Sequence, residues 1–185
     1  MHCEDSNAKT IAQALAWAMA ELANGESPAV DSRVLLCAVL DCQRTYLFTW
    51  PDKTLSKAQF TRYKNLIARR SEGYPVAYLT GNRDFWSLTL NVNESTLIPR
   101  PETELLVEAA LALKLPDAAR VCDLGTGTGA IALALKTEQP AWQVSGVDRI
   151  VEALELAAAN AQLNGQLEVN WLLSHWFAAL PADSR

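Results

Sequence analysis

The sequence lacks any hydrophobic run long enough to cross a membrane. A spanning helix needs about 18 or more consecutive apolar residues, and no run here approaches that length. The first residues, M-H-C-E-D-S-N, also lack the basic stretch and the following apolar segment of a secretory signal peptide. Half of the 185 residues are hydrophobic and 20% are charged, as is typical of a soluble globular protein. We therefore predict a cytoplasmic protein that does not contact membranes.

Cysteine and histidine are scarce. The four cysteines are Cys3, Cys37, Cys42 and Cys122. None of them forms a C-x-x-C pair, and the two histidines, His2 and His175, are not spaced as metal ligands. We therefore predict no metal site and interpret the cysteines as buried, reduced thiols.

Basic residues are in deficit over the second part of the chain. Residues 1–80 hold 9 Lys and Arg against 8 Asp and Glu, a net charge of +1, whereas residues 81–185 hold 7 against 13, a net charge of −6. The two values sum to the net charge of −5. Because nucleic-acid binding depends on neutralising phosphates, an acidic body disfavours it. We therefore predict no direct nucleic-acid partner.

The most informative segment is R-V-C-D-L-G-T-G-T-G-A-I-A-L-A-L, residues 120–135. Its start is typical of a buried parallel strand, and the glycines permit a tight turn and close approach of a ligand to the backbone. A helical pattern follows over residues 128–136, so the N–H groups at its start point at whatever occupies the turn. A second strand over residues 142–147 leads to Asp148, 19 residues beyond Gly129. That spacing is close to the one at which an acidic residue binds a ribose diol.

Two cofactors are compatible with these glycines. Gly125-x-Gly127-x-x-Ala130 also satisfies the pattern of NAD-binding proteins, so the glycines alone do not select the cofactor. Asp123 lies two residues before the first glycine. A carboxylate at that place repels the pyrophosphate of NAD and suits the ammonium and sulfonium groups of S-adenosylmethionine. We therefore favour the methyl donor over a dinucleotide, and either of them over a purely structural glycine turn.

The first 80 residues predict a small helical bundle. Ser27 followed by Pro28 is typical of an N-cap and the first helical position. Ser56 with Gln59 predicts a capping box at the start of a long third helix. Apolar residues at helical spacing continue each of these segments, so residues 1–80 are expected to form a separate helical domain.

Residues 81–100 change character. Leu88, Leu90 and Val92 alternate with polar residues, which predicts a half-buried strand. Residues 82–86 are a plausible antiparallel partner, so the segment is expected to form a β-hairpin linker between two domains.

The order of elements from Arg120 onward is strand, glycine loop, helix, strand, helix, strand. The second of these helices is predicted over residues 151–163, and the last strand over residues 167–173. Such alternation predicts an α/β fold with a parallel sheet covered by helices. The expected fold class is therefore a helical bundle, a β-hairpin linker, and part of a doubly wound, Rossmann-like sheet.

Six motifs of one family occur in order along the chain. They are P-V-A-Y-L-T-G (75–81), F-W-S-L (85–88), T-L-I-P-R-P-E-T-E (96–104), D-L-G-T-G-T-G-A-I-A-L-A-L (123–135), G-V-D (146–148) and S-H-W-F (174–177). Together they resemble the PrmC/HemK family, the protein-(glutamine-N5) methyltransferases of bacterial peptide chain release factors. Many methyltransferases share the glycine loop, whereas the hairpin with I-P-R-P-E-T-E is far more specific to this family.

The resemblance implies a class I methyltransferase fold and a function in translation termination. The family transfers a methyl group from S-adenosylmethionine to the side-chain amide of the glutamine in the Gly-Gly-Gln loop of release factors. Residues 1–80 would then be the substrate-binding domain, residues 81–100 the linker, and residues 101–185 the first part of the cofactor-binding domain. We expect release factors as partners and a monomeric chain.

The resemblance also implies which residues form the site. The residues that match the family's cofactor site are Asp123, Gly125, Thr126, Gly127, Thr128, Gly129, Asp148 and Trp176. By this match Asp148 binds the ribose hydroxyls and Trp176 lies by the adenine, although Trp176 could equally be a core aromatic residue. The residues expected to border the substrate site are Pro99, Arg100 and Glu102. Asn160 either faces the cofactor or lies on a helix surface, and His175 is interpreted as exposed and without a catalytic role.

One expected motif has no match in these residues. The family's catalytic motif, N-P-P-Y, is expected shortly after S-x-W-F, where this chain has A-A-L-P-A-D-S-R. No residue is therefore assigned a catalytic role, and the strand over residues 120–124 is expected to be an open edge. We expect a truncated chain whose own activity is in doubt. The alternatives are a non-catalytic remnant that binds release factors and an NAD-dependent oxidoreductase half-domain.

Overall fold

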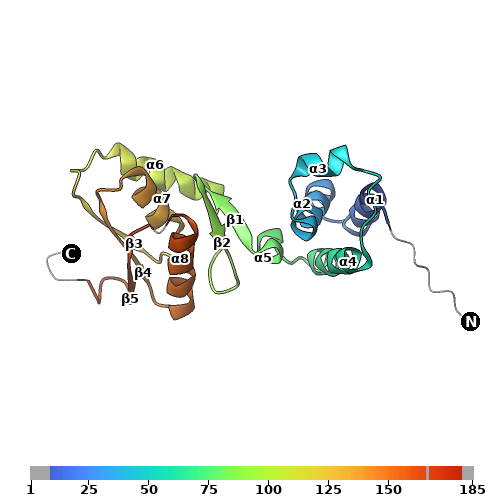
Figure 1. Cartoon of the computed structure of the whole chain (residues 1–185). Helices are drawn as coiled ribbons and strands as arrows, with labels where there is room; N and C mark the ends of the chain where they lie inside the picture. Colours follow the sequence, from blue (N-terminus) through green and yellow to red (C-terminus); the bar gives the residue numbers. More distant parts are fainter. Residues whose placement is uncertain (1–8, 166, 181–185) are drawn as a thin grey trace, which may run out of the picture. The chain divides into compact units, whose positions relative to one another are not determined.

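The computed structural model describes residues 9–165 and 167–180, and the chain divides between Thr80 and Gly81 into two compact units (Figure 1). Each unit has its own cluster of buried hydrophobic residues. Within these described residues, no helix is long and apolar enough to span a membrane.

The first unit is a bundle of helices, as the sequence predicted. The helices are α1 (Ile11–Glu21), α2 (Pro28–Leu40), α3 (Arg44–Thr49), α4 (Lys57–Ser71) and α5 (Val76–Thr80). They pack on an apolar cluster that includes Ile11, Leu35 and Ile67. Tyr63 is fully buried among them and donates its hydroxyl to the backbone oxygen of Ser32 at 2.9 Å. The buried phenol is therefore hydrogen-bonded, as buried tyrosines usually are.

Serine residues begin α2 and α4 in different ways. Before α4, the Gln59 N–H donates to the Ser56 hydroxyl at 3.1 Å and the Ser56 N–H donates to the Gln59 side chain at 2.9 Å, which confirms the predicted capping box. Before α2, Ser27 occupies the N-cap position but makes no capping bond to the backbone. Its hydroxyl donates instead to Asp31 at 2.9 Å, and Asp31 pairs with Arg70 of α4 at 2.7 Å. The predicted N-cap position of Ser27 and the predicted first helical position of Pro28 are therefore confirmed, although the Ser27 hydroxyl joins this side-chain network instead of bonding to the helix backbone.

The second unit begins with an antiparallel hairpin. Its strands are β1 (Asn82–Phe85) and β2 (Leu88–Asn91), and Phe85 pairs with Leu88 next to the turn. Leu88 and Leu90 are buried while the residues that follow each of them are exposed. The predicted half-buried strand is therefore confirmed.

Helices and parallel strands alternate beyond the hairpin. They are η1 (Pro101–Thr103), α6 (Glu104–Ala112), β3 (Arg120–Leu124), α7 (Ala130–Glu138), β4 (Gln143–Asp148), α8 (Val151–Leu163) and β5 (Asn170–Leu173). The strands form one parallel sheet in the order β3-β4-β5, which confirms the predicted α/β fold. Strand β5 begins at Asn170, later than predicted, because the Leu167 N–H donates to the backbone oxygen of Ala161 in α8 at 3.1 Å.

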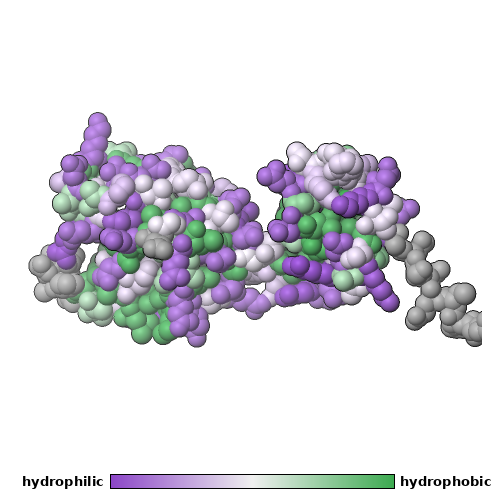
Figure 2. Space-filling model, in the orientation of Figure 1, coloured by the Kyte–Doolittle hydropathy of each residue, from purple (hydrophilic) through white to green (hydrophobic). Residues whose placement is uncertain are grey.

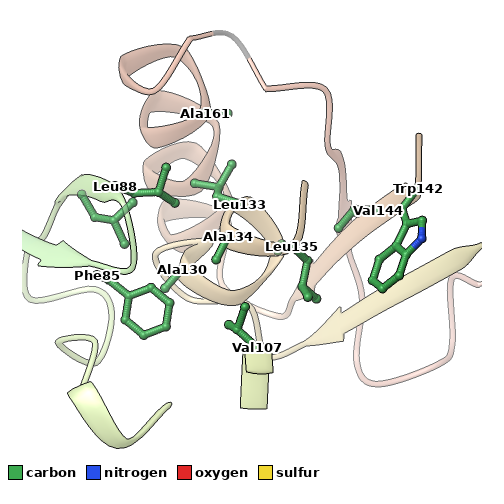
Figure 3. Packing of buried hydrophobic residues seen from close by; sticks show 12 residues of the cluster. Phe85, Leu88, Val107, Ala130, Leu133, Ala134, Leu135, Trp142, Val144 and Ala161 are labelled. Carbon is green, nitrogen blue, oxygen red and sulfur yellow. The ribbon is translucent and has the colours of Figure 1, made fainter. Parts of the chain in front are cut away.

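Helix α7 lies at the centre of the second core (Figure 3). Its Leu133 is fully buried, and the cluster around α7 includes Phe85 and Leu88 of the hairpin, Val107 of α6 and Val144 of β4. Burying a side chain of this size stabilises the fold by about 1.5–3 kcal/mol. The hairpin and the helix that follows the glycine loop therefore belong to one core.

Helix α8 covers the outer edge of β2 with two side-chain amides. The Asn91 N–H donates to Asn160 Oδ1 at 2.7 Å, and Asn160 Nδ2 donates to the Asn91 oxygen at 3.1 Å. Asn164 forms the same pair of bonds with Thr89 at 3.2 and 3.0 Å. Residues 81–100, which we expected to be a linker, contain this hairpin and lie within the second unit. Both interpretations of Asn160 are wrong, since its side chain is fully buried against the hairpin.

One face of the parallel sheet is exposed at β3. Cys122 was expected to be buried, but it is exposed, because it lies beside its strand partner Ser145 in the lining of an open hollow against the sheet. Cys37 and Cys42 are half-buried free thiols, and Cys3 lies outside the described residues. Apolar residues also reach the surface of the second unit in Figure 2, and Leu105 and Leu106 of α6 are among its exposed hydrophobic residues.

Candidate cofactor-binding site

A glycine loop joins the end of β3 to the start of α7. The N–H groups of Gly125 and Thr126 both donate to the backbone oxygen of Val147 in β4, at 2.8 and 2.9 Å, and the Gly129 N–H donates to the Thr126 oxygen at 2.8 Å. These bonds fold the loop over the carboxyl ends of β3 and β4. Open α/β sheets bind their ligands at this end of the strands.

The glycines of the loop have different surroundings. Gly125, Gly127 and Gly129 have φ angles of +78°, +54° and +81°, a conformation that other residues rarely adopt. A Cβ on Gly125 would meet no atom within 4 Å, whereas a Cβ on Gly129 would lie 3.0 Å from the Trp171 ring and 3.1 Å from Ala157. Gly125 therefore borders open space, whereas Gly129 allows close packing beneath the loop.

Asp148 at the end of β4 holds two backbone segments together. The Gly127 N–H donates to its Oδ2 at 3.0 Å, and the Ile150 N–H before α8 donates to its Oδ1 at 3.1 Å. Each carboxylate oxygen keeps acceptor capacity for a further donor. The same carboxylate can therefore fix the loop and accept a hydrogen bond from a ligand hydroxyl.

A pocket of about 240 Å³ lies at these strand ends and brings together Gly125, Asp148 and Trp176. The Trp176 side chain is 63% exposed and its backbone φ is +51°, so the alternative that Trp176 is a core aromatic residue is wrong. Trp176 is therefore an exposed aromatic residue in the lining of the pocket. His175 and Ser174, for which the sequence suggested no role, line the same pocket.

Asp123 and Thr126 do not line this pocket but bond to each other. The Thr126 hydroxyl donates to Asp123 Oδ2 at 2.7 Å, and the Asp123 carboxylate also accepts a hydrogen bond from the backbone of Ala132 in the first turn of α7. Gly129 is the N-cap of α7 and has no side chain to bond to that turn. The Asp123 carboxylate therefore accepts a hydrogen bond from an N–H group at the helix start, where a negative charge is favourable.

The environment of Asp123 raises the pKa of its carboxyl group. Burial is the main cause and the nearby Asp148 charge adds to it, while the hydrogen bonds from Thr126 and Ala132 act in the opposite direction. Gly127, Thr128 and Gly129 likewise lie outside the pocket lining. Of the predicted cofactor residues, three therefore line the pocket and the other five shape the loop beside it.

The segment between the hairpin and α6 reaches the glycine loop at Thr96. Thr96 is buried, and its Cβ lies 3.8 Å from the position of a Cβ on Gly127. Pro99 is also buried, whereas Arg100 and Glu102 are exposed, and none of the three lines the pocket. The contact through Thr96 was not predicted from the sequence.

A larger hollow lies against the sheet. It has a volume of about 1080 Å³ and its lining includes Cys122, Ser145 and Leu172. None of the predicted cofactor or substrate residues lines it. The smaller pocket is therefore the better candidate, because it lies where the glycine loop and Asp148 meet.

Two residues beneath the loop were missed by sequence reasoning. A Cβ on Gly146 of β4 would lie 2.4 Å from the Trp171 ring and 2.9 Å from the Thr126 hydroxyl. The absence of a side chain at Gly146 therefore leaves room for the Trp171 indole, which also lies beside Gly129. The only signal in the sequence was a glycine inside a strand, which often marks a close approach of another group.

Asp123→Asn is expected to stabilise the second unit at neutral pH. Because the folded-state pKa lies above its ordinary value of 3.8, the folded state binds the proton more tightly than the unfolded state. That contribution to stability is fully present below the unfolded pKa and is lost as pH rises through the folded pKa. Asparagine keeps an acceptor for the Thr126 hydroxyl without the charge. Urea denaturation should therefore show a stability difference between the variant and the wild type that grows from acidic to neutral pH.

Asp117→Asn is the matched control for this measurement, because Asp117 is an exposed aspartate of the same unit. We expect it to show no such pH-dependent difference. A difference for Asp123→Asn that is constant with pH, or one that both variants share, contradicts the prediction.

Two family models match the chain. The PrmC N-terminal domain matches residues 13–81, and a methyltransferase domain matches residues 115–184. Residues 82–114, which contain the hairpin and α6, lie between the two matched segments. The first match covers most of the helical unit, and the second covers the glycine loop and the parallel sheet.

Curated proteins match over most of the chain. The chain is 52% identical to the release factor glutamine methyltransferase of Shewanella oneidensis over 172 residues, which are 92% of this chain and 60% of that protein. It is 45% identical to the protein of that name from Escherichia coli over 163 residues, 88% of this chain and 59% of the other. The chain therefore spans about 60% of the length of these relatives.

One solved structure matches the chain more weakly. It is a protein-L-isoaspartate O-methyltransferase from Plasmodium falciparum in complex with S-adenosyl-L-homocysteine, 14% identical, with a TM-score of 0.41, over 51% of this chain and 47% of the other.

Proposed function

Because this chain is related by sequence to the family of release factor glutamine methyltransferases, we propose that it binds S-adenosylmethionine in the pocket beside Gly125 and Asp148. The observation that carries the proposal is the pocket itself. Three separate segments of the chain border this one cavity. They contribute the open backbone of Gly125, the carboxylate of Asp148 and the exposed residue Trp176.

Each part of the pocket suits a part of the ligand. Gly125 leaves room for close approach, Asp148 retains acceptor capacity for ribose hydroxyls, and the Trp176 indole offers a face for adenine. The Asp123 carboxyl group lies near Asp148, whose charge helps to raise the pKa of Asp123, and a negative charge at Asp123 favours a cationic ligand over a pyrophosphate. When bound, S-adenosylmethionine supplies a methyl carbon activated by its positively charged sulfur.

The methyl acceptor that we propose is the side-chain amide of the glutamine in the Gly-Gly-Gln loop of peptide chain release factors. The match of residues 13–81 to the PrmC N-terminal domain supports a role of the helical unit in holding the release factor. Pro99, Arg100 and Glu102 are proposed to border the mouth of the substrate site. An amide nitrogen is a weak nucleophile, so holding it in line with the methyl carbon carries much of such catalysis.

The cofactor half of the proposal is tested by calorimetric titration of the chain with S-adenosylhomocysteine and with NADH. Saturable binding of S-adenosylhomocysteine at one site, with no competition from NADH, supports it. Binding of NADH without binding of S-adenosylhomocysteine overturns it in favour of a dinucleotide site.

The acceptor half is tested with S-adenosylmethionine carrying a labelled methyl group. The chain is incubated with a release factor and, as control, with the same factor whose motif glutamine is replaced by alanine. Label on the intact factor alone supports the proposal. Retention of the factor on the immobilised chain without label indicates a non-catalytic binding protein, and label on the alanine variant contradicts the proposed acceptor.

A further inference from the structure

Asn160 makes one hydrogen bond that its neighbour Asn164 lacks. The two asparagines are one helical turn apart, and their partners Asn91 and Thr89 are two residues apart on β2. A rise of about 6 Å over four helical residues matches about 6.8 Å over two strand residues, so the amides can follow the strand. Asn160 Nδ2 also donates to the backbone oxygen of Thr128 in the glycine loop at 2.9 Å.

The orientation of the Asn160 amide is determined by its partners. Its oxygen accepts from an N–H group, and its nitrogen donates to two carbonyl oxygens, those of Asn91 and Thr128. The reverse orientation would place the amide oxygen against both carbonyls. Asn160 is fully buried, so removing its side chain leaves these backbone groups without a partner, which is costly in a buried site.

The carbonyl that Asn160 holds belongs to the peptide unit that starts α7. The Thr128 oxygen and the Gly129 N–H are parts of one planar peptide, and that N–H donates to the Thr126 oxygen at 2.8 Å. Gly129 has a φ of +81° and its surroundings are crowded by Trp171 and Ala157. A rotation of this peptide breaks both bonds at once, so Asn160 fixes the last turn of the loop.

We infer that Asn160 is a positioning residue that holds the glycine loop in the conformation needed for methyl-donor binding and ties that loop to the hairpin. The effect of Asn160 on ligand binding rests on the proposed function. The role of Asn160 in holding the loop does not. The hairpin leads directly into the segment that contacts Gly127 through Thr96. Asn160 therefore links the Gly127–Gly129 turn to the hairpin. The chain continues from this hairpin into the segment that contains Thr96.

The test compares Asn160→Ala with Asn164→Ala in the whole chain. Both variants remove one amide that pairs with β2, but only the first removes the bond to the loop. Without ligand, we expect hydrogen exchange of the Gly129 amide, measured by NMR, to be about tenfold faster in Asn160→Ala than in Asn164→Ala. We also expect the Kd for S-adenosylhomocysteine to rise about tenfold in Asn160→Ala and to change little in Asn164→Ala.

The outcomes separate the inference from the proposed function. If the wild-type chain binds no S-adenosylhomocysteine, the proposed function fails, while the Gly129 exchange rates still test Asn160. Equal exchange in the two variants overturns the positioning role and leaves both asparagines as supports of the hairpin.

If Asn160→Ala does not fold, Asn160→Asp keeps the acceptor for the Asn91 N–H and regains one donor when protonated. Gly129 protection in Asn160→Asp should then increase as pH falls, after correction for intrinsic exchange. Protection that does not change with pH relative to the wild type also overturns the inference.

Discussion

Gly146→Ala is expected to lower the free energy of unfolding of the second unit by about 3 kcal/mol, at the upper end of what overpacking typically costs. The new Cβ would lie 2.4 and 2.6 Å from two ring atoms of Trp171 and 2.9 Å from the Thr126 hydroxyl. A rigid indole cannot yield by rotating a flexible tip, so the ring or strand β4 must move. Hydrogen exchange of peptides from residues 81–165, followed by mass spectrometry, measures the loss for this unit alone.

The cause of this loss can be tested by relieving the clash. In Gly146→Ala with Trp171→Leu, the smaller side chain should recover part of the stability lost in Gly146→Ala, relative to Trp171→Leu alone. Gly129→Ala is the matched comparison, because it also clashes with Trp171 but has a φ of +81°. Its backbone strain remains when the ring is removed, so Trp171→Leu should rescue it less. A Gly146→Ala variant of wild-type stability contradicts the packing described for Trp171.

Local patterns in the sequence were sufficient to predict the main elements of the second unit. The strand at Arg120–Leu124 and the helix at Val151–Leu163 have the predicted bounds. For both elements, the apolar residues that predict the element and the residues that end it are neighbours in the sequence, so no distant contact was needed to predict the bounds. The turn at Gly125–Gly129 was predictable for the same reason, since glycine is the residue that adopts these φ angles readily.

Contacts between distant residues explain what could not be predicted. Asn160 and Asn91 are 69 residues apart, and nothing near Asn160 in the sequence indicates that a strand edge will meet its amide. Trp171 lies under the loop only because β5 pairs with β4. The bonds of Asp123 are different, because its partners Thr126 and Ala132 are close to it in the sequence, and only the missing side chain at the N-cap of α7 leaves that helix start open to its carboxylate.

These distant contacts make the loop part of the packed core. The Gly125–Gly129 turn is bonded to β4 through Val147 and Asp148 and to α8 through Asn160. Groups held on rigid elements position a ligand more accurately than groups on a free loop. A change at any of these anchors should therefore alter ligand affinity as well as stability.

Asp148→Ala is expected to raise the Kd for S-adenosylhomocysteine about 100-fold. A hydrogen bond to a charged group contributes about 1.5–3 kcal/mol, and about 1.4 kcal/mol corresponds to a factor of ten in Kd. The variant also leaves the Gly127 and Ile150 N–H groups without their acceptor. Direct binding of the ribose and indirect support of the loop therefore both contribute to the loss, which calorimetric titration would measure.

The two contributions can be separated with a ligand that lacks one ribose hydroxyl. If the carboxylate binds the ribose, the wild-type chain should prefer S-adenosylhomocysteine over its 2′-deoxy analogue, and Asp148→Ala should bind both with similar affinity. If Asp148 only supports the loop, the variant should weaken both ligands by the same factor and keep the preference. Glu152→Ala, which removes an exposed charge from the first turn of α8, controls for the change in net charge and should leave both Kd values nearly unchanged. An unchanged Kd for S-adenosylhomocysteine in Asp148→Ala refutes both roles, because the loss of a ribose contact and the loss of loop support would each weaken binding.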